Sequence, residues 1–352
     1  MSSPRIEISY RKLAYNTKAI VNLYGSRGID VVGVTKGVGA FPPLAAMLVK
    51  NGISTLADSR LSNIINMRDA GIEAEFLLLR IPMKSQAADV VKYADISLNS
   101  ELTVMKALSD CAIKQRKIHQ VILMLELGDL REGLMPEDLD FAIGKVIKMK
   151  GLELIGLGTN LACMGGITPN TAKMNQLSSI VQAAELKFKM KFKVVSGGNS
   201  ANYQWMMQAT CTGRINSLRI GESIWLGRET LERRPIAGLY NNAFSLVAEV
   251  IEVQAKASLP YGIVAQNAMG KKPVFVERGL MNRAILAIGI QDVPICGLQP
   301  RLNIEILAAS SDHLIVDAKN SGIKVGQEIV FDINYSALLA LMTSQYITKS
   351  MI

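Results

Sequence analysis

Polar and charged residues that could carry chemistry follow short apolar runs in the first two thirds of the chain. Lys36 follows the run VVGV, and a lysine amine that is partly desolvated and close to other cations can form a Schiff base with an aldehyde. The segments SGGNS at 196–200 and RIGE at 219–222 combine glycine with polar residues, and the free backbone N–H groups of such turns bind phosphate. The combination predicts a site for a phosphorylated aldehyde cofactor.

Each of these features also has a simpler interpretation. A lysine at the end of a strand is often a surface residue whose aliphatic stem covers apolar neighbours. Glycine-rich turns between a strand and a helix are common. A functional role for Lys36 is supported by other polar residues, which follow the neighbouring apolar runs in the same way. These residues are Asp58, Arg60, Arg80, Asn99, Arg131, Thr159 and Asn160.

The elements that would position these residues alternate between short β-like runs and longer stretches with helical periodicity. Runs such as FLLL and VILML are apolar throughout, which is typical of parallel strands that are buried on both faces. Eight strand–helix units predict an α/β fold of the TIM type, a (β/α)8 barrel whose strand ends and following loops form the site. The expected strands are 31–34, 53–57, 75–79, 95–98, 121–126, 153–158, 193–196 and 218–221.

The pattern changes at about residue 244. The runs VAEVIEV, KPVFV, RAILAIG, HLIVD and EIVFDI are short strands separated by turns, which predicts a C-terminal all-β domain. We therefore expect a cofactor-binding barrel at 1–235 and a β-strand domain at 236–352, joined through 233–242. The early strand 6–9, within residues 1–10, is a candidate to pair with the β domain rather than to join the barrel.

Composition narrows the class of protein. The 352 residues carry a formal charge of +9, but the lysines and arginines form no dense block, which argues against nucleic acid and favours anionic small molecules. The apolar runs are far shorter than the roughly 20 residues that cross a bilayer, so no membrane partner is expected. Four cysteines without metal or disulfide spacing, and an N-terminus without a secretion profile, predict a cytoplasmic protein without a metal site. His119, which precedes a strand, is expected at the surface.

Several motifs together resemble a known family. VTKG, GDLREG, GTN, SGGNSA, LRIGESIWLG, RAILAIGIQDV and SSDHLIVD are similar to segments of the alanine-racemase-fold family, the fold type III enzymes that depend on pyridoxal 5′-phosphate (PLP). The similarity covers essentially the whole chain, and it is strongest to the branch of ornithine racemase and predicted amino-acid racemases. The resemblance implies a PLP-dependent racemase that interconverts L- and D-amino acids.

The resemblance also implies roles for individual residues. Lys36 would carry PLP, and Arg219 would donate to the pyridine nitrogen, so that this nitrogen stays unprotonated. Arg131 matches an arginine near the phenolic oxygen and the substrate. The remaining cofactor-binding positions are Ser200, Gly221, Glu222 and Tyr346 at the phosphate, with the backbone N–H groups of Gly221 and Glu222 as donors, and Asn160 and Asn199 beside them.

Racemisation by two bases needs an acid–base group on each face of the α-carbon. Lys36 would serve one face, and the family supplies a tyrosine from the partner subunit for the other. Tyr261 in LPYG matches that tyrosine and is assigned this role, with a turn tyrosine after a proline as the alternative interpretation. Ser311 and Asp312 match the segment that closes over the substrate. These assignments imply a homodimer with shared active sites.

One departure and several alternatives remain. Asn160 stands where alanine racemases have a histidine, and an amide cannot titrate, so the electrostatics around Tyr261 must differ. A decarboxylase of the same fold and a non-catalytic PLP-carrying homeostasis protein are the alternative functions. Ornithine, lysine or another basic amino acid is the expected substrate, with alanine or serine as alternatives. A basic substrate requires an acidic residue in the pocket that binds its side chain, and the candidates are Asp58, Glu132 and Asp312.

Overall fold

The computed structural model describes residues 3–267, 270 and 272–352. The chain divides into two compact units, one formed by Arg11–Asn241 and the other by Met1–Tyr10 together with Asn242–Ile352. The division after Asn241 lies a few residues beyond the boundary after residue 235 that the sequence suggested. Within the described residues, no helix combines the length and apolar character needed to cross a bilayer.

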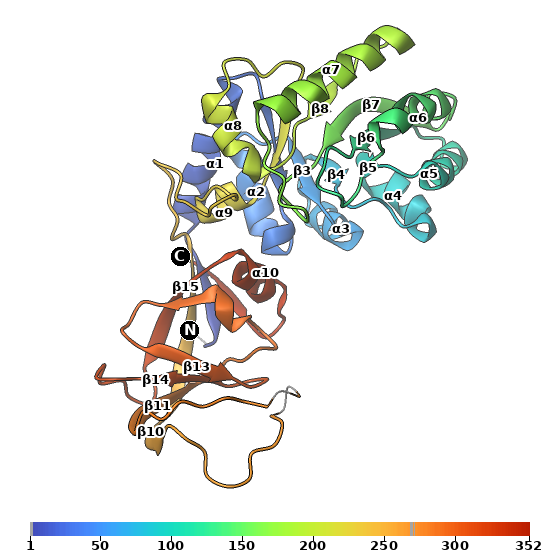
Figure 1. Ribbon diagram of the computed structural model, residues 1–352. Coiled ribbons are helices and arrows are strands. Elements are labelled where there is room, and N and C mark those ends of the chain that lie inside the picture. Colours follow the sequence, from blue (N-terminus) through green and yellow to red (C-terminus); the bar gives the residue numbers. More distant parts are fainter. Residues whose placement is uncertain (1–2, 268–269, 271) are drawn as a thin grey trace. The chain divides into compact units, whose positions relative to one another are not determined.

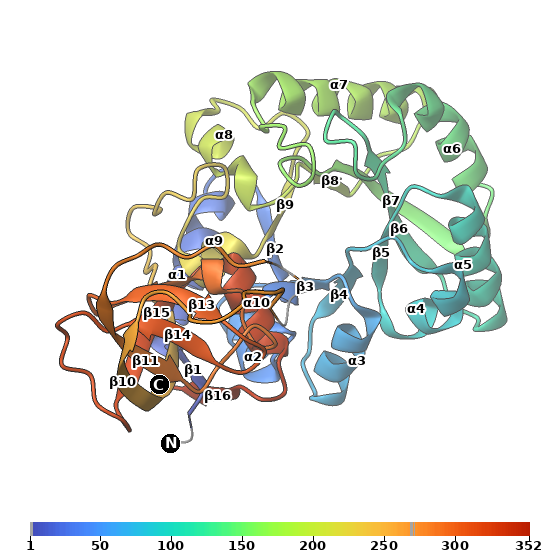
Figure 2. The same cartoon turned by 60° about the horizontal axis from the view of Figure 1, so that its bottom comes forward.

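The first unit is a closed barrel of eight parallel strands, as the sequence predicted. Figure 2 shows the strands as a ring, with helices such as α4 to α7 outside it. The ring closes where β2 pairs with β9, in the register Gly33 to Ile220. The barrel strands are β2 (Asp30–Val34), β3 (Thr55–Asp58), β4 (Glu75–Leu78), β5 (Ile96–Asn99), β6 (His119–Leu125), β7 (Leu152–Thr159), β8 (Val194–Ser196) and β9 (Ser217–Ile220).

The barrel interior is packed with branched and aliphatic side chains. Val32 and Val34 of β2 alternate inward with a period of two, and the other strands contribute in the same way. Side chains at the intervening positions face the surrounding helices, and most of them are apolar, with Ser97 and Asn99 of β5 as polar exceptions. The helices of this unit are α1 (Tyr10–Gly25), α2 (Pro42–Lys50), α3 (Leu61–Asp69), α4 (Ala87–Tyr93), α5 (Leu102–Lys114), α6 (Leu139–Val146), α7 (Thr171–Phe188), α8 (Tyr203–Gln208) and α9 (Glu222–Leu226).

The expectation for His119 was wrong. The residue is the first of β6, its exposed fraction is 2%, and its Nε2 lies 2.8 Å from the hydroxyl of Ser97 on β5. Burial lowers the pKa of His119 to about 4 because the charged imidazolium would lose its hydration. The imidazole is therefore a neutral part of the packing between strand and helix.

The described part of the second unit is a mostly antiparallel sheet, in which only β1 and β16 pair in parallel, together with one α-helix (Figure 1). Its strands run in the order β12-β15-β10-β11-β14-β13, and β1 pairs with both β10 and β16, so the N-terminal strand belongs to this sheet. Ile6 and Ile8 of β1 are fully buried in it. The elements are β1 (Arg5–Ile8), β10 (Phe244–Ala257), β11 (Leu280–Leu286), β12 (Leu298–Pro300), β13 (Glu305–Ala309), β14 (Leu314–Asp317), β15 (Glu328–Ile333), α10 (Tyr335–Thr343) and β16 (Thr348–Met351).

One strand expected from the sequence does not form. Residues 272–276, the run KPVFV, pair with no strand in the described part of the chain, and the exposed fraction of Val274 is 92%. The alternating apolar pattern gives a segment a preference for pairing, but it does not supply a partner strand. The segment instead borders a groove, described below.

Candidate active site

Lys36 begins a short 3-10 turn (Lys36–Val38) directly after β2. The residue before it, Thr35, is fully buried and donates a hydrogen bond of 2.8 Å from its hydroxyl to the carboxylate of Asp58. This contact fixes the backbone from which Lys36 projects. Lys36 itself is half-buried, and among the described residues no acceptor takes a hydrogen bond from its Nζ. The amine is thus available for a reaction partner.

Arg219 lies on β9, the strand next to Lys36 in the barrel. It is 4% exposed, and its acceptors are all neutral: the hydroxyl of Ser196, the carbonyl of Thr159 at 3.0 Å and the amide oxygen of Asn160 at 3.1 Å. Burial lowers its pKa to about 10, so the guanidinium is still charged at neutral pH. A cavity of about 230 Å³, lined largely by the first residues of the barrel strands, reaches Arg219 from their amino-terminal side.

Two asparagines connect Arg219 to the glycine-rich turn after β8. Asn199 donates from Nδ2 to the amide oxygen of Asn160 at 3.1 Å and to the carbonyl of Leu161 at 2.9 Å. Its own Oδ1 accepts from the backbone N–H of Ala201, which caps the next turn. The same Asn160 oxygen therefore receives hydrogen bonds from both Asn199 and Arg219. This link was not apparent in the sequence.

The turns after β8 and β9 bring donors together. The backbone N–H groups of Gly221 and Ser223 point to the hydroxyl of Ser200, at 3.4 and 3.3 Å. A Cβ on Gly221 would stand 3.1 Å from the Cβ of Val34, which explains why this turn can approach the end of β2 so closely. Ser200, Gly221 and Ser223 thus form a cluster of donors beside the strand that carries Lys36.

Glu222 lies at the start of α9, and its carboxylate forms an ion pair with Arg233. Burial raises the pKa of Glu222, while Arg233 and the positive charge of Lys36 act in the opposite direction. The carboxylate is therefore close enough to Lys36 to interact with it electrostatically. The sequence predicted only a backbone contact for this residue.

Arg131 lies in the loop after β6, and its side chain is exposed. Its guanidinium forms a bidentate ion pair with Glu132 and contacts the sulfur of Cys163, which belongs to the loop after β7. Asp129 fastens the same two loops together, because its carboxylate accepts from the backbone N–H groups of Cys163 and Met164 at 3.1 and 2.9 Å. Burial raises the pKa of Asp129, but these donors lower it below its usual range.

Some of the polar residues that follow barrel strands have structural roles instead. Asp58 is fully buried and accepts from Thr35, from the backbone N–H of Arg60 at 2.9 Å and from the amide of Asn63 at 3.0 Å. Asn99 donates to Ser97, the residue that contacts His119, and therefore belongs to that buried cluster. Arg60 and Arg80 are exposed.

Four predicted site residues lie in the second unit. Tyr261 is 99% exposed, and Tyr346 is 63% exposed. Asp312 forms an ion pair of 2.8 Å with His313, and Gly289 leaves room for this segment, because a Cβ there would stand 2.3 Å from the backbone of Ser311. Among the described residues, no hydrogen bond or ion pair links Tyr261 or Tyr346 to Ser311 or Asp312.

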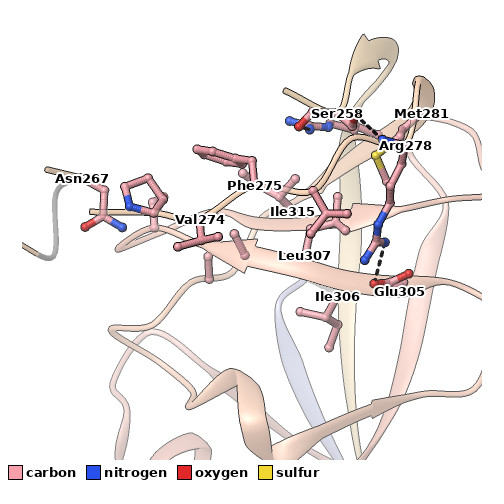
Figure 3. Close-up of a pocket in the computed structure, with 16 residues that line it drawn as sticks. Ser258, Asn267, Val274, Phe275, Arg278, Met281, Glu305, Ile306, Leu307 and Ile315 are labelled. Atoms are coloured by element: carbon pink, nitrogen blue, oxygen red, sulfur yellow. Dashed lines mark hydrogen bonds and ion pairs between the residues drawn. The ribbon is translucent and has the colours of Figure 1, made fainter. Parts of the chain in front are cut away.

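The second unit also contains a groove of about 510 Å³ (Figure 3). It is mostly apolar, with Val274, Phe275 and Leu307 on its walls, and an ion pair of 2.9 Å between Arg278 and Glu305 at one end. Tyr261, Tyr346, Ser311 and Asp312 are not part of its lining. The groove is therefore distinct from the predicted site.

The fold is shared with solved racemases and with another kind of enzyme. An alanine racemase from Clostridium difficile superimposes with a TM-score of 0.77 at 19% identity, covering 100% of this chain and 96% of the other. A D-threonine aldolase from Filomicrobium marinum gives a TM-score of 0.77 at 15% identity, over 100% and 91%. These likenesses establish the fold and leave the reaction open.

Sequence comparison is more specific. The family model described as the alanine racemase N-terminal domain matches residues 8–229. The chain is 41% identical to an ornithine racemase from Acetoanaerobium sticklandii, over 99% of each chain. It is 38% identical to a lysine racemase from Thermotoga maritima, over 99% of this chain and 98% of the other. The protein therefore belongs to the alanine racemase family and is an amino-acid racemase, an isomerase.

Proposed function

We propose that this protein is a PLP-dependent racemase of ornithine, lysine or a related basic amino acid, with Lys36 as the cofactor lysine. The observation that carries the proposal is the position of Lys36. It follows β2 after one residue, has an amine without an acceptor among the described residues, and the strand that pairs with β2 carries the buried Arg219. The two relatives that match over almost their full lengths are an ornithine racemase and a lysine racemase, which supports the substrate class.

The residues present fit PLP. The cofactor has an aldehyde, a pyridine nitrogen and a phosphate, and the chain offers a partner for each. Lys36 has a free amine for the aldehyde, Arg219 a guanidinium held by neutral acceptors, and Ser200, Gly221 and Ser223 a cluster of donors that a phosphate could engage. When bound, PLP supplies the electron-withdrawing system that lets an amino acid lose its α-proton.

Arg219 would donate to the pyridine nitrogen. Its pKa of about 10 means that it remains protonated at neutral pH, so it would donate a hydrogen bond and keep its proton. Thr159 and Asn160 hold the guanidinium in place from the other side. The pyridine nitrogen would thus accept a hydrogen bond without gaining a proton, which favours rapid return of a proton to the α-carbon over competing reactions.

Two groups would move the proton. Lys36 would act at its Nζ on one face of the α-carbon, and Tyr261 of the partner subunit would act at its hydroxyl on the other. The 99% exposure of Tyr261 is consistent with a residue whose environment is completed by a second chain. Ser311 and Asp312 would close over the substrate, and Tyr346 would contact the phosphate. All three residues belong to the second unit, as Tyr261 does. The proposal therefore includes a homodimer.

Chiral chromatography of the purified holoprotein tests the proposal. Incubation with L-ornithine or L-lysine should give the D-enantiomer and approach a 1:1 mixture, and the D-enantiomer should give the L-form. An amine product without the antipode would identify a decarboxylase instead. A protein that binds PLP but leaves all twenty L-amino acids and ornithine unchanged would be a PLP-carrying protein.

We also propose a cytoplasmic location. The four cysteines are all free thiols in the structure, which is consistent with a reducing compartment. Fractionation of the native cells, with an antibody against the protein, tests this directly. Recovery of the protein outside the cytoplasm would contradict it.

A further inference from the structure

A racemase of basic amino acids needs an anionic group for the ammonium at the end of the substrate side chain. The following inference rests on the proposed function and concerns which residue supplies that group. In this chain, the carboxylates that could reach the site follow the ends of the barrel strands, where Lys36 and Arg219 also lie. Most of them are already used or are fully exposed.

Four of these carboxylates are buried and maintain the shape of the loops. Each accepts at least one hydrogen bond from a backbone N–H group, and a carboxylate committed to the backbone cannot be diverted to a ligand without loosening its loop. These residues and their backbone donors are Asp58 with Arg60, Glu126 with Gly128, Asp129 with Cys163 and Met164, and Glu229 with Leu231.

Other carboxylates are poorly placed. Glu101, Glu137, Asp138 and Glu232 are exposed. Glu222 forms an ion pair with Arg233 and lies on the turn that carries the proposed phosphate donors. The residue that binds the substrate's ammonium must lie away from the phosphate, because the substrate's side chain extends from the reacting carbon and not from the cofactor's phosphate.

Glu132 satisfies these requirements. It follows β6, which stands four strands from β2 in either direction around the eight-stranded ring, so it lies on the rim opposite Lys36. Its side chain is 20% exposed, and its only hydrogen-bond and ion-pair partner among the described residues is the guanidinium of Arg131. The side chain of Arg131 is 38% exposed and that of Glu132 only 20%, so the carboxylate lies at the rim, partly covered but open to a ligand.

The loop that carries Glu132 is rigidly built. Leu134 forms a backbone bridge to Leu125, and Gly133 has a φ of +141° with no room for a side chain, since a Cβ would stand 2.4 Å from the backbone nitrogen of Glu126. The Asp129 contacts with the next loop hold the other end. A carboxylate on such a loop loses little conformational entropy when it binds a ligand.

We propose that the Glu132 carboxylate, oriented by Arg131, binds the side-chain ammonium of the substrate and so selects basic amino acids. A carboxylate offers about four acceptor sites, and Arg131 occupies two of them, one on each oxygen. The remaining two can accept from an ammonium. Arg131 therefore fixes the orientation of the carboxylate without saturating it.

The test compares substrates that differ only in the terminal ammonium. Wild type, Glu132→Gln and the matched control Glu101→Gln, at an exposed site on the neighbouring strand end, are assayed as holoenzymes with L-ornithine, L-lysine and the uncharged L-norvaline. For Glu132→Gln we expect kcat/KM for the two basic amino acids to fall about 10- to 100-fold, mainly through KM, with L-norvaline nearly unchanged. Glu101→Gln should behave as wild type, and Glu132→Asp should recover part of the loss.

Titration calorimetry gives a second readout that does not require turnover. L-Ornithine should bind Glu132→Gln about 10- to 100-fold more weakly than wild type, while L-norvaline binds both equally. Equal losses for charged and uncharged ligands would show that Glu132 only positions Arg131, and an unchanged L-ornithine affinity would exclude any role; either result overturns the inference. If instead wild type produces no D-enantiomer from any amino acid, the proposed function fails. The ratio of the L-ornithine affinities of wild type and Glu132→Gln still shows whether Glu132 binds the ammonium.

Discussion

The amide oxygen of Asn160 accepts a hydrogen bond of 3.1 Å from Nη2 of Arg219. Asn199 donates to the same oxygen, so the asparagine links a buried cation to the glycine-rich turn after β8. Because an amide cannot take up a proton, this contact is the same at every pH at which the protein is folded. The hydrogen bonds of Arg219 are thus made to neutral dipoles and not to titrating groups.

Asn160→Ala should therefore destabilise the barrel. Removing the oxygen leaves a donor of a buried guanidinium without its acceptor, and we expect the free energy of unfolding to fall by about 1–2 kcal/mol. Urea denaturation of wild type and variant measures the difference. Asn241→Ala, at an exposed position, is the control and should have no effect. Equal stability of Asn160→Ala and wild type would show that water replaces the amide fully.

The sequence predicted the barrel well because parallel strands are buried on both faces and so appear as apolar runs. It also placed Lys36 after the first barrel strand and Arg219 on the eighth, and closure of the ring makes these two strands neighbours. It could not predict contacts between loops that are far apart in the chain, such as Asp129 with Cys163, because no local pattern encodes them. His119 was misjudged because the expected strand began two residues late, which left a buried residue in a loop.

Lys36→Ala should abolish the covalent attachment of PLP. Wild type mixed with PLP should develop a visible absorption band that borohydride removes, and mass spectrometry of the reduced protein should find the modification on the peptide that contains Lys36. The variant should show neither, while its urea midpoint stays close to that of the apo wild type, because Lys36 has no hydrogen-bond acceptor among the described residues. A modification of another lysine in the wild type would contradict the assignment.

His119 should make the fold sensitive to acid. Its pKa in the folded state is about 4, below the value of about 6.5 in an unfolded chain, so protonation favours unfolding. The stabilisation by neutral His119 is complete above pH 6.5 and is lost as the pH falls through about 4. The maximum loss is about 3 kcal/mol, since one pKa unit corresponds to about 1.4 kcal/mol.

A titration of stability with pH tests this expectation. Urea unfolding at several pH values between 7 and 4 should show a steeper decline for wild type than for His119→Gln, whose side chain cannot be protonated. Parallel curves for the two proteins would mean that other groups cause the acid sensitivity. Asp129 is one such group, because its pKa in the folded state is lowered. The ionised carboxylate therefore stabilises the fold above the pKa of an aspartate in an unfolded chain. This stabilisation is lost at a lower pH than that of His119.

Gly133→Ala should distort the loop that presents Arg131 and Glu132. The φ of +141° is unfavourable for alanine, and the added Cβ would collide with the backbone at Glu126. We expect a loss of at least about 2 kcal/mol in the free energy of unfolding, together with reduced racemisation of basic amino acids. Gly25→Ala is the control, since a Cβ there has no neighbour within 4 Å. Wild-type activity in Gly133→Ala would show that the loop tolerates rearrangement.

Tyr261→Phe should separate proton transfer from cofactor binding. The change removes one hydroxyl from a side chain that is 99% exposed in the single chain, so neither the fold nor the PLP band should change. If Tyr261 of the partner subunit is the second base, racemisation should fall by about 10²- to 10⁴-fold, the range that a positioned acid–base group contributes. Exchange of the α-proton in deuterated water should persist for the enantiomer whose proton faces Lys36 and nearly vanish for the other. Tyr15→Phe, which keeps the ring that packs against Tyr240, is the control and should turn over as wild type does. Loss of exchange for both enantiomers, or for neither, would rule out the assignment of one face to Tyr261.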